Sequence, residues 1–376
     1  MQKKLIALAV AGLVSGAAFA QTNVTIYGAA DATFEVVQAK GADAGNIARF
    51  NRVQSNSSIL GFRGSEDLGG GLKAIFQFES GIDLDHARGD RNDSARLFNR
   101  DTFVGLQGAF GQVKMGINTG PARSLGAAVD LTIGATGIGA NTAMLGKVAG
   151  NGSNAFGYWD TRRSNSVQYV TPKFGGFEVR AMYGAGESRP DGTKAAATYE
   201  LGGFYNNGPW YAGLTYGQAK PNTAGYGVGL VPGGVVLGDK TTNIRLAGTY
   251  TFQAGHKIAV LFEQNKVNEW NAGGDDVKSY TYGIGGKFKV SQPGAIIAQV
   301  YQVGKLKGVE DAGDYKANFI ALGYEHSLSK RTTLKAYYSR ISNKDLSRYS
   351  YGIGNIAGVA GGSNPTGFAV GIRHSF

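Results

Sequence analysis

Residues 243–252 read Asn-Ile-Arg-Leu-Ala-Gly-Thr-Tyr-Thr-Phe, and nearly every second position is apolar. In an extended chain, alternate residues point to opposite faces, so the apolar and polar sets separate. The apolar set is Ile244, Leu246, Tyr250 and Phe252, and the polar set is Asn243, Arg245, Thr249 and Thr251. A helix would mix the two sets. The stretch therefore predicts a strand with one face in an apolar medium and one in water.

The same alternation recurs along the chain after residue 22, in about sixteen segments. Clear examples are residues 24–36, 73–79, 177–183, 210–216 and 280–289, and the phase is ambiguous at 96–108 and 293–305. The polar faces carry charges on strand after strand, and aromatic residues recur near segment ends, which favours a membrane barrel over a soluble sandwich. We predict an all-β fold, a 16-stranded antiparallel transmembrane β-barrel, since about 22 residues per strand and connection suits such strands.

The predicted connections alternate between short turns and long loops, as the two ends of a barrel require. The tight turns are expected at residues 67–71, 108–111, 172–176, 206–209 and 327–330, where turn-forming residues gather. The long loops are expected at residues 38–55, 84–96, 118–163, 218–240, 267–278 and 344–365. We expect one sheet without a domain boundary.

Composition agrees with an exported strand protein. Residues 1–20 combine a basic start, a short apolar run and an Ala18-Phe19-Ala20 end, which predicts a cleaved signal peptide before a single barrel domain at 21–376. The chain has no cysteine, 60 Gly, 19 Tyr and 19 Phe. The formal charge of +11 can indicate nucleic acid, an acidic surface or an anion-lined pore. Export and the scatter of Lys and Arg along strands argue against a nucleic-acid partner.

Several stretches closely resemble the Gram-negative general porins of the Burkholderia, Bordetella, Comamonas and Neisseria type. They are Ser58 to Ala74, Phe103 to Leu106 with Phe110-Gly111, Asn165 to Tyr169 running to Phe174-Gly175-Gly176-Phe177, Leu328 to Thr332, and Val370 to Phe376. The resemblance implies a homotrimer of sixteen-stranded barrels whose third long loop folds inward to narrow the pore. It also implies that the barrel-insertion machinery reads the last strand, which ends in Phe376. Where relatives carry Gly-Arg-Gln, this chain has Gly116-Ile117-Asn118.

Such a pore acts by size exclusion and by the field at its narrowest point. Inward-facing basic residues are therefore the candidate site, and they predict a preference for anions. By strand period they are Arg63, Arg100, Arg180, Arg245 and Lys335, with Lys114 and Lys73 less certain in height. Any one of them could instead be a solvated rim charge far from the constriction.

Residues 119–163 are the candidate constriction loop, because they are rich in Gly and Ala and carry few charges. Asp130 and Asp160 are their only carboxylates, and either could face the arginine wall. A pairing of Asp130 with Arg63 is one hypothesis. The alternative is that the segment is an ordinary exposed loop.

Other functions have weaker signals. The histidines show no metal-binding spacing, and Ser327-x-x-Lys330 sits in a predicted turn, so we expect neither an enzyme nor a cofactor. Calcium at the loop acids Asp83, Asp85, Asp275 and Asp276 stays open. A substrate-selective channel and a surface adhesin or structural barrel are the alternatives. The expected surroundings are outer-membrane lipid and lipopolysaccharide, and the expected solutes are small hydrophilic ions and molecules.

Overall fold

The computed structural model describes residues 23–85, 97–147, 158–186, 195–220, 240–268 and 275–376, so the expected signal peptide at 1–20 lies outside the described residues. The strands are β1 (Asn23–Lys40), β2 (Ile47–Ser55), β3 (Ser58–Gly69), β4 (Leu72–Ile82), β5 (Thr102–Gly108), β6 (Gly111–Thr119), β7 (Arg162–Val170), β8 (Phe177–Ala185), β9 (Ala197–Asn207), β10 (Trp210–Lys220), β11 (Thr241–Thr251), β12 (Lys257–Val267), β13 (Val277–Lys289), β14 (Gly294–Val303), β15 (Ala317–Ser327), β16 (Thr332–Asn343) and β17 (Asn364–Ser375). The helical segments are α2 (Pro121–Val129), η1 (Ile133–Ala135), η2 (Asn141–Ala143) and η3 (Ala312–Tyr315). No helix among these described segments is long and apolar enough to cross a membrane.

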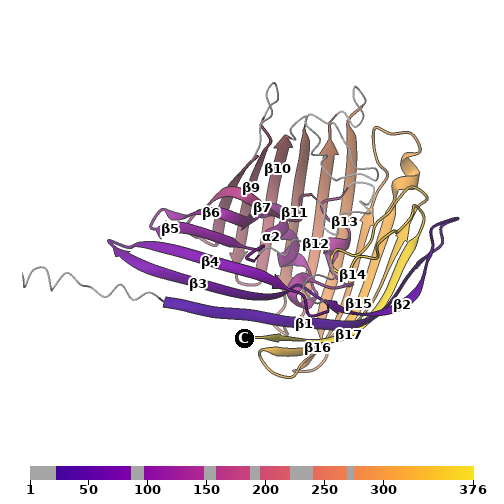
Figure 1. The fold of residues 1–376 in the computed structure, drawn as a ribbon, viewed down its shortest axis with the longest axis horizontal. Coiled ribbons are helices and arrows are strands. Elements are labelled where there is room, and N and C mark those ends of the chain that lie inside the picture. The colour runs from indigo at the N-terminus through magenta and orange to yellow at the C-terminus, as the bar shows by residue number, and fades with distance from the viewer. Residues whose placement is uncertain (1–22, 86–96, 148–157, 187–194, 221–239, 269–274) are drawn as a thin grey trace, which may run out of the picture.

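The strands form one closed antiparallel sheet (Figure 1). Each strand pairs with the next along the chain, except that β2 and β3 both pair with β1, and β17 returns to pair with β1 from Ala29 opposite Ser375 to Lys40 opposite Asn364. Gly28 and Phe376 complete this seam with two backbone hydrogen bonds of 3.0 Å. A Cβ on Gly28 would lie 2.4 Å from the Phe376 ring, so the glycine makes room for the last side chain. Closure pairs the strands on both sides around the barrel, as a span through lipid demands, and only residues 23–27 of β1 extend past Phe376 and pair with β3 alone.

The predicted number of strands, sixteen, is confirmed, because β2 and β3 are two halves of one barrel strand. Both pair with β1, β2 with its second half and β3 with its first. Between them Ser57 adopts a positive φ of 56°, a bulge that inserts one residue and reverses the alternation. The expected long loop at 38–55 is wrong. Strand structure continues to Lys40 and resumes at Ile47.

The two faces of the sheet carry the alternation read from the sequence. Leu214, Leu246 and Val260 on β10, β11 and β12 are each more than half exposed, at 55%, 52% and 53%. Their inward neighbours Arg245 and Glu263 are fully buried. An apolar outer wall around a polar, charged interior is the pattern of a barrel in lipid, and the reverse of a soluble protein.

The five expected tight turns are confirmed, and they connect β3 to β4, β5 to β6, β7 to β8, β9 to β10 and β15 to β16. Short connections also follow β11 and β13, where no turn was expected. Long connections at 186–196 and 304–316 were missed as well. The long connections join the strands at the end of the barrel opposite the short turns. We call this end the loop end.

Candidate functional site in the barrel interior

The described residues of the third loop, 120–147 and 158–161, pack against inward-facing side chains of the barrel. The loop's helix α2 contacts β8 through β12 (Figure 1). Leu125 and Val129 of α2 belong to the same buried cluster as Ala247 on β11 and Leu261 on β12. Within the interior of this barrel, apolar residues are thus concentrated where the loop touches the wall. The loop is held by packing as well as by the charges described next.

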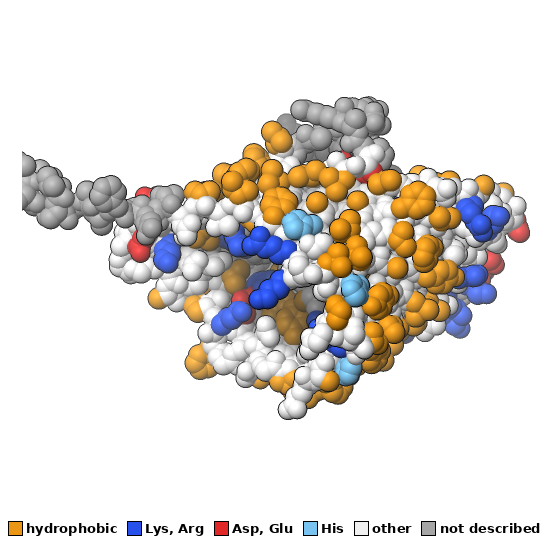
Figure 2. Space-filling model, turned by 90° about the horizontal axis from the view of Figure 1, so that it is seen from below, with side chains coloured by type: hydrophobic (Ala, Val, Ile, Leu, Met, Phe, Trp, Pro, Cys, Tyr) orange, Lys and Arg blue, Asp and Glu red, His pale blue; other side chains and the backbone are white. Residues whose placement is uncertain are grey.

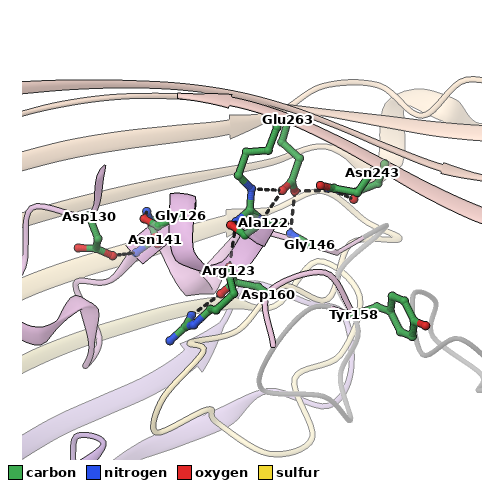
Figure 3. Close-up of polar contacts among 12 residues, drawn as sticks. Ala122, Arg123, Gly126, Asp130, Asn141, Gly146, Tyr158, Asp160, Asn243 and Glu263 are labelled. Atoms are coloured by element: carbon green, nitrogen blue, oxygen red, sulfur yellow. Dashed lines mark hydrogen bonds and ion pairs between the residues drawn. The ribbon is translucent and has the colours of Figure 1, made fainter. Parts of the chain in front are cut away.

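A fully buried ion cluster joins the third loop to the wall (Figure 3). Arg245 on β11 donates from Nε to Glu263 at 2.6 Å and from Nη1 to Asp160 at 3.0 Å. Nη1 also donates to the carbonyl of Ala122 at 2.5 Å, at the start of α2. Glu263 in turn accepts the backbone N–H of Gly146 at 2.7 Å. The cluster therefore fixes both ends of the described part of the loop to β11 and β12.

These contacts correct the expected roles of Arg245 and Asp160. Arg245 faces inward, as its strand period predicted, but its side chain is 0% exposed and its charge is compensated by two carboxylates. Asp160 faces one arginine of the wall, Arg245, as expected, and also contacts Arg123. A buried, paired arginine cannot attract a passing solute. These two residues position the loop.

Asp130 shapes the loop internally. Its carboxylate accepts hydrogen bonds from the Thr132 backbone at 2.9 Å, the Thr132 hydroxyl at 2.7 Å and the Asn141 backbone at 2.6 Å. Burial raises the pKa of Asp130 even though these donors oppose the shift. The hypothesised pairing with Arg63 is not formed, because the Arg63 guanidinium lies 5.1 Å from the Tyr27 ring instead.

Lys335 is also inward-facing and also compensated. Its ammonium forms an ion pair with Asp31, and both side chains are 0% exposed. Asp31 accepts a second bond, from Arg373 Nη1 at 3.0 Å. Lys335 is thus part of the barrel wall near the β1–β17 seam, and the expectation that its charge faces the open lumen is wrong.

An open cavity of about 610 Å³ occupies the interior on the turn side of α2. Arg63 from β3, Lys114 from β6 and Arg180 from β8 converge on it. Each cation lies against an inward aromatic ring: Arg63 on Tyr27, Lys114 on Phe103 at 4.9 Å and Arg180 on Phe204 at 4.7 Å. In Figure 2 basic side chains border a hollow on the lower face of the molecule.

The three cations differ in whether a carboxylate forms an ion pair with them. Arg180 forms an ion pair with Glu178 at 2.7 Å. Arg63 and Lys114 have no ion pair within the part of the chain that the structure describes. The uncompensated positive charge of this cavity therefore comes from Arg63 and Lys114.

Several residues of this cavity are not predicted from the sequence, because the candidates were charged residues alone. Four glutamines line it, namely Gln77, Gln107, Gln112 and Gln168. Their inward strand phase was the available signal. Asp101 lines it too, from the connection before β5, within the segment 96–108 where the strand phase is ambiguous.

An ion-pair network lies between this cavity and a smaller one of about 260 Å³ near the loop end. Arg100 donates to Glu79 at 2.6 Å and also borders the smaller cavity. Arg162 bridges Glu79 at 4.0 Å and Asp101 at 2.8 Å. Burial would raise the pKa of Asp101, but Arg162 and the hydrogen bonds from Thr119 hold it below its ordinary value. Asp101 is thus charged, and the network is balanced between two acids and two bases.

Lys73 is placed away from these groups. It is exposed and stands opposite Asp67 beside the β3–β4 turn. It shares the inward phase of Gln77 but does not line the large cavity. It is therefore a rim charge, the alternative considered for every basic residue.

The third loop is also tied to the connection before β17. Lys147 is 2% exposed, and its Nζ donates to the carbonyls of Ala143 at 2.9 Å and Ser350 at 3.4 Å. Burial lowers the pKa of Lys147 to about 8, and the charge of Asp160 offsets only part of that effect. Burying the charged ammonium in the loop therefore lowers the stability of the folded protein.

We expect the replacement Lys147→Met to remove a pH dependence of stability. Since the ordinary pKa is 10.5, the cost of burying the ammonium is fully present below pH 8 and disappears as pH rises to 10.5. Over that range the free energy of unfolding of wild type should therefore rise by on the order of 3 kcal/mol relative to that of the variant. Thermal unfolding midpoints at pH 7, 8, 9 and 10, followed by circular dichroism, measure the difference. If the difference between the two unfolding midpoints stays constant from pH 7 to pH 10, Lys147 does not titrate in that range.

The closed sheet, its apolar outer wall and its charged interior cavity define a membrane-spanning β-barrel with an internal polar passage. A model of the family described as Gram-negative porin matches residues 7–346. The chain belongs to this family, and it is an outer-membrane porin channel.

Named relatives agree over the whole chain. Outer membrane porin protein 32 of Delftia acidovorans is 36% identical, and an outer membrane porin protein of Bordetella pertussis is 31% identical, each alignment covering 100% of both chains. The solved anion-selective porin from Comamonas acidovorans is 31% identical, with a TM-score of 0.75 over 95% of this chain and 100% of that one. A trimer form of an outer membrane protein of Vibrio cholerae, at 18% identity and a TM-score of 0.65 over 94% and 99%, shares the fold.

Proposed function

We propose that the large interior cavity is a passage for small hydrophilic solutes that prefers anions, and that Arg63 and Lys114 set this preference. The observation that carries the proposal is that both cations line the cavity without a carboxylate partner in the described residues. Charges in a narrow, poorly screened passage act on every ion that crosses it. The similarity to a porin titled anion-selective supports the assignment.

The third loop is proposed as the constriction of this passage. Ser124 on α2 and Thr119 just before it line the large cavity, while Leu125 and Val129 are buried against the wall. One side of the loop is thus available to solutes and the other is fixed. The network of two acids, Glu79 and Asp101, and two bases, Arg100 and Arg162, is balanced and adds little net charge beside it.

Conductance across a planar bilayer tests the passage directly. The purified full chain should give stable open channels, and under a tenfold KCl gradient the zero-current potential should have the sign that marks chloride as more permeant than potassium. A potential of the opposite sign would refute the anion preference. Absence of channels from folded protein would refute the passage itself and favour the structural-barrel alternative.

A substrate-selective channel is the second candidate, favoured by the carboxamides of Gln77, Gln107, Gln112 and Gln168 beside the cations. Such a lining offers donors and acceptors in fixed places, as a recognition site does. Flux that saturates and shows competition between solutes would distinguish it from simple diffusion. The members of this family are channels rather than enzymes. We therefore expect no enzymatic activity, and this expectation stays a prediction.

Three further proposals concern assembly. We propose that residues 1–20 are removed on export, that three chains associate, and that the insertion machinery reads β17 through Phe376. The last is supported by the outward apolar phase of β17, in which Phe368, Val370 and Ile372 are exposed. A native mass of one chain per particle would contradict trimerisation.

A further inference from the structure

The smaller cavity of about 260 Å³, called here the loop-end cavity, lies where four segments of the chain meet. These are the residues around the β2–β3 bulge from Arg52 to Ser58, the end of β4 with Asp83 after it, Arg100, and residues 352–355 of the connection before β17. The loop-end cavity shares no lining residue with the large cavity. Its charges therefore form a set of their own.

Arg52 shapes the loop-end cavity. Its Nε donates to Glu35 at 2.8 Å, its Nη1 donates to the carbonyl of Asn355 at 3.3 Å, and its Nη2 donates to the carbonyl of Gly354. Glu35 is 0% exposed and balances the charge of the arginine. A Cβ on Gly354, whose φ is +63°, would lie 2.8 Å from Arg52 Nη2. The last long connection thus closes tightly over Arg52.

Arg100 is balanced as well, but it keeps free donors. Its Nε donates to Glu79 at 2.6 Å, while its two Nη groups donate to no residue that the structure describes. The side chain is 23% exposed and lies across Gly81, where an added Cβ would be 3.7 Å from Arg100 Cδ. The two Nη groups are therefore available to a carboxylate in the loop-end cavity, and the planar guanidinium favours such a pairing.

Asp83 carries the charge of this cavity that no described residue balances. It follows β4 directly, is exposed, and lines the cavity without forming an ion pair within the described ranges. It comes two residues after Gly81, over which Arg100 lies, so their backbones are about 7 Å apart. A free carboxylate and a partly free guanidinium thus lie within reach of one small molecule.

These charges distinguish between classes of solute. A simple anion would be attracted by Arg100 and repelled by Asp83, and a simple cation would meet the reverse. A zwitterion satisfies both groups, because its carboxylate can accept from Arg100 while its ammonium donates to Asp83. Ile82 and Ile353 add an apolar part to the lining, which suits a short aliphatic side chain.

We propose that the loop-end cavity binds a small zwitterionic α-amino acid, with its carboxylate on Arg100 and its ammonium on Asp83. The proposal deepens the proposed function and rests on it, since it names a class of substrate for the passage. The uncompensated charges of the large cavity are positive, so that cavity offers no free carboxylate to an ammonium among the described residues. Amino-acid binding and anion preference therefore arise at different places in the barrel.

Saturation-transfer-difference NMR of the detergent-solubilised full chain, titrated with L-alanine, tests this site. Asp83→Asn should bind L-alanine about fivefold more weakly than wild type, because it removes one exposed ion pair with the ligand. The matched control Asp43→Asn removes another exposed acid at the loop end, one that does not line the cavity, and should bind like wild type.

Two analogues of L-alanine separate its charged groups. L-alaninamide, which lacks the carboxylate, should bind wild type about fivefold more weakly than L-alanine, since it loses its ion pair with Arg100. L-lactate, which lacks the ammonium, should bind Asp83→Asn at least as tightly as wild type, because the variant removes a repelling charge.

Three results would overturn the proposal. Equal affinity of wild type and Asp83→Asn for L-alanine would remove Asp83 from the site. Equal weakening by Asp43→Asn would reduce the effect to the general charge of the loop end. Equal affinity of wild type for L-alanine and L-alaninamide would leave a simple cation site. Circular dichroism of each variant confirms that the barrel is folded.

Recording in planar bilayers keeps this site distinct from the passage. Open channels in a protein that does not bind L-alanine would contradict the amino-acid site alone. Binding of L-alanine by a protein that forms no channels would contradict the passage instead, because the NMR titration in detergent requires no transport.

Discussion

Replacing Arg245 with methionine is expected to destabilise the protein by about 3–5 kcal/mol, because it leaves the buried Glu263 without its cation and Asp160 with Arg123 alone. Glu263 and Asp160 are both 0% exposed and both contact Arg245. The loss of stability should be concentrated in the third loop, because Arg245 also donates a hydrogen bond to the Ala122 carbonyl. Thermal unfolding by circular dichroism measures the stability, and single-channel recording should show an unsteady conductance where wild type gives one level.

A charge-matched series separates ion pairing from general damage. Lys289→Met removes an exposed lysine at the turn end of β13 and should change neither quantity. The triple variant Arg245→Met/Glu263→Gln/Asp160→Asn removes all three charges together and should recover a large part of the lost stability. If Arg245→Met unfolds at the wild-type midpoint with a steady conductance, the cluster does not hold the loop.

The alternation of residues predicted the barrel and the direction of its side chains, because both depend on the local period of a strand. Arg63, Arg180, Arg245 and Lys335 all face inward as expected. The period failed where Ser57 inserts a bulge, since one added residue exchanges the two faces, and it placed Arg100 on a strand although β5 begins at Thr102.

The partners of these side chains could not be predicted in the same way. Lys335 meets Asp31 across 304 positions of sequence, and Arg245 meets Asp160 across 85. The first contact requires the closure of the barrel, and the second requires the path of a loop. Neither is visible to a periodic pattern. A basic residue on an inward face is therefore equally compatible with a free charge and with a compensated one.

This distinction decides which charges govern permeation. We expect the double variant Arg63→Gln/Lys114→Gln to lose most of the anion preference, because these are the cavity's cations without an ion pair in the described chain. At roughly 1 kcal/mol for each charge in a partly screened passage, each substitution should lower the chloride-to-potassium permeability ratio about fivefold. The zero-current potential under a KCl gradient should shift toward the potassium side accordingly.

Lys73→Gln is the matched control, because Lys73 shares the inward phase but stands at the rim outside the cavity. It should leave the zero-current potential nearly unchanged, and Arg63→Lys should retain the preference because it retains the charge. An equal shift from Lys73→Gln would mean that ions respond to the total charge of the barrel rather than to the cavity. If the folded double variant keeps the wild-type zero-current potential, Arg63 and Lys114 do not set the selectivity. The network around Arg100 and Arg162 would then have to set it, although we expect little effect from that network because its charges are balanced.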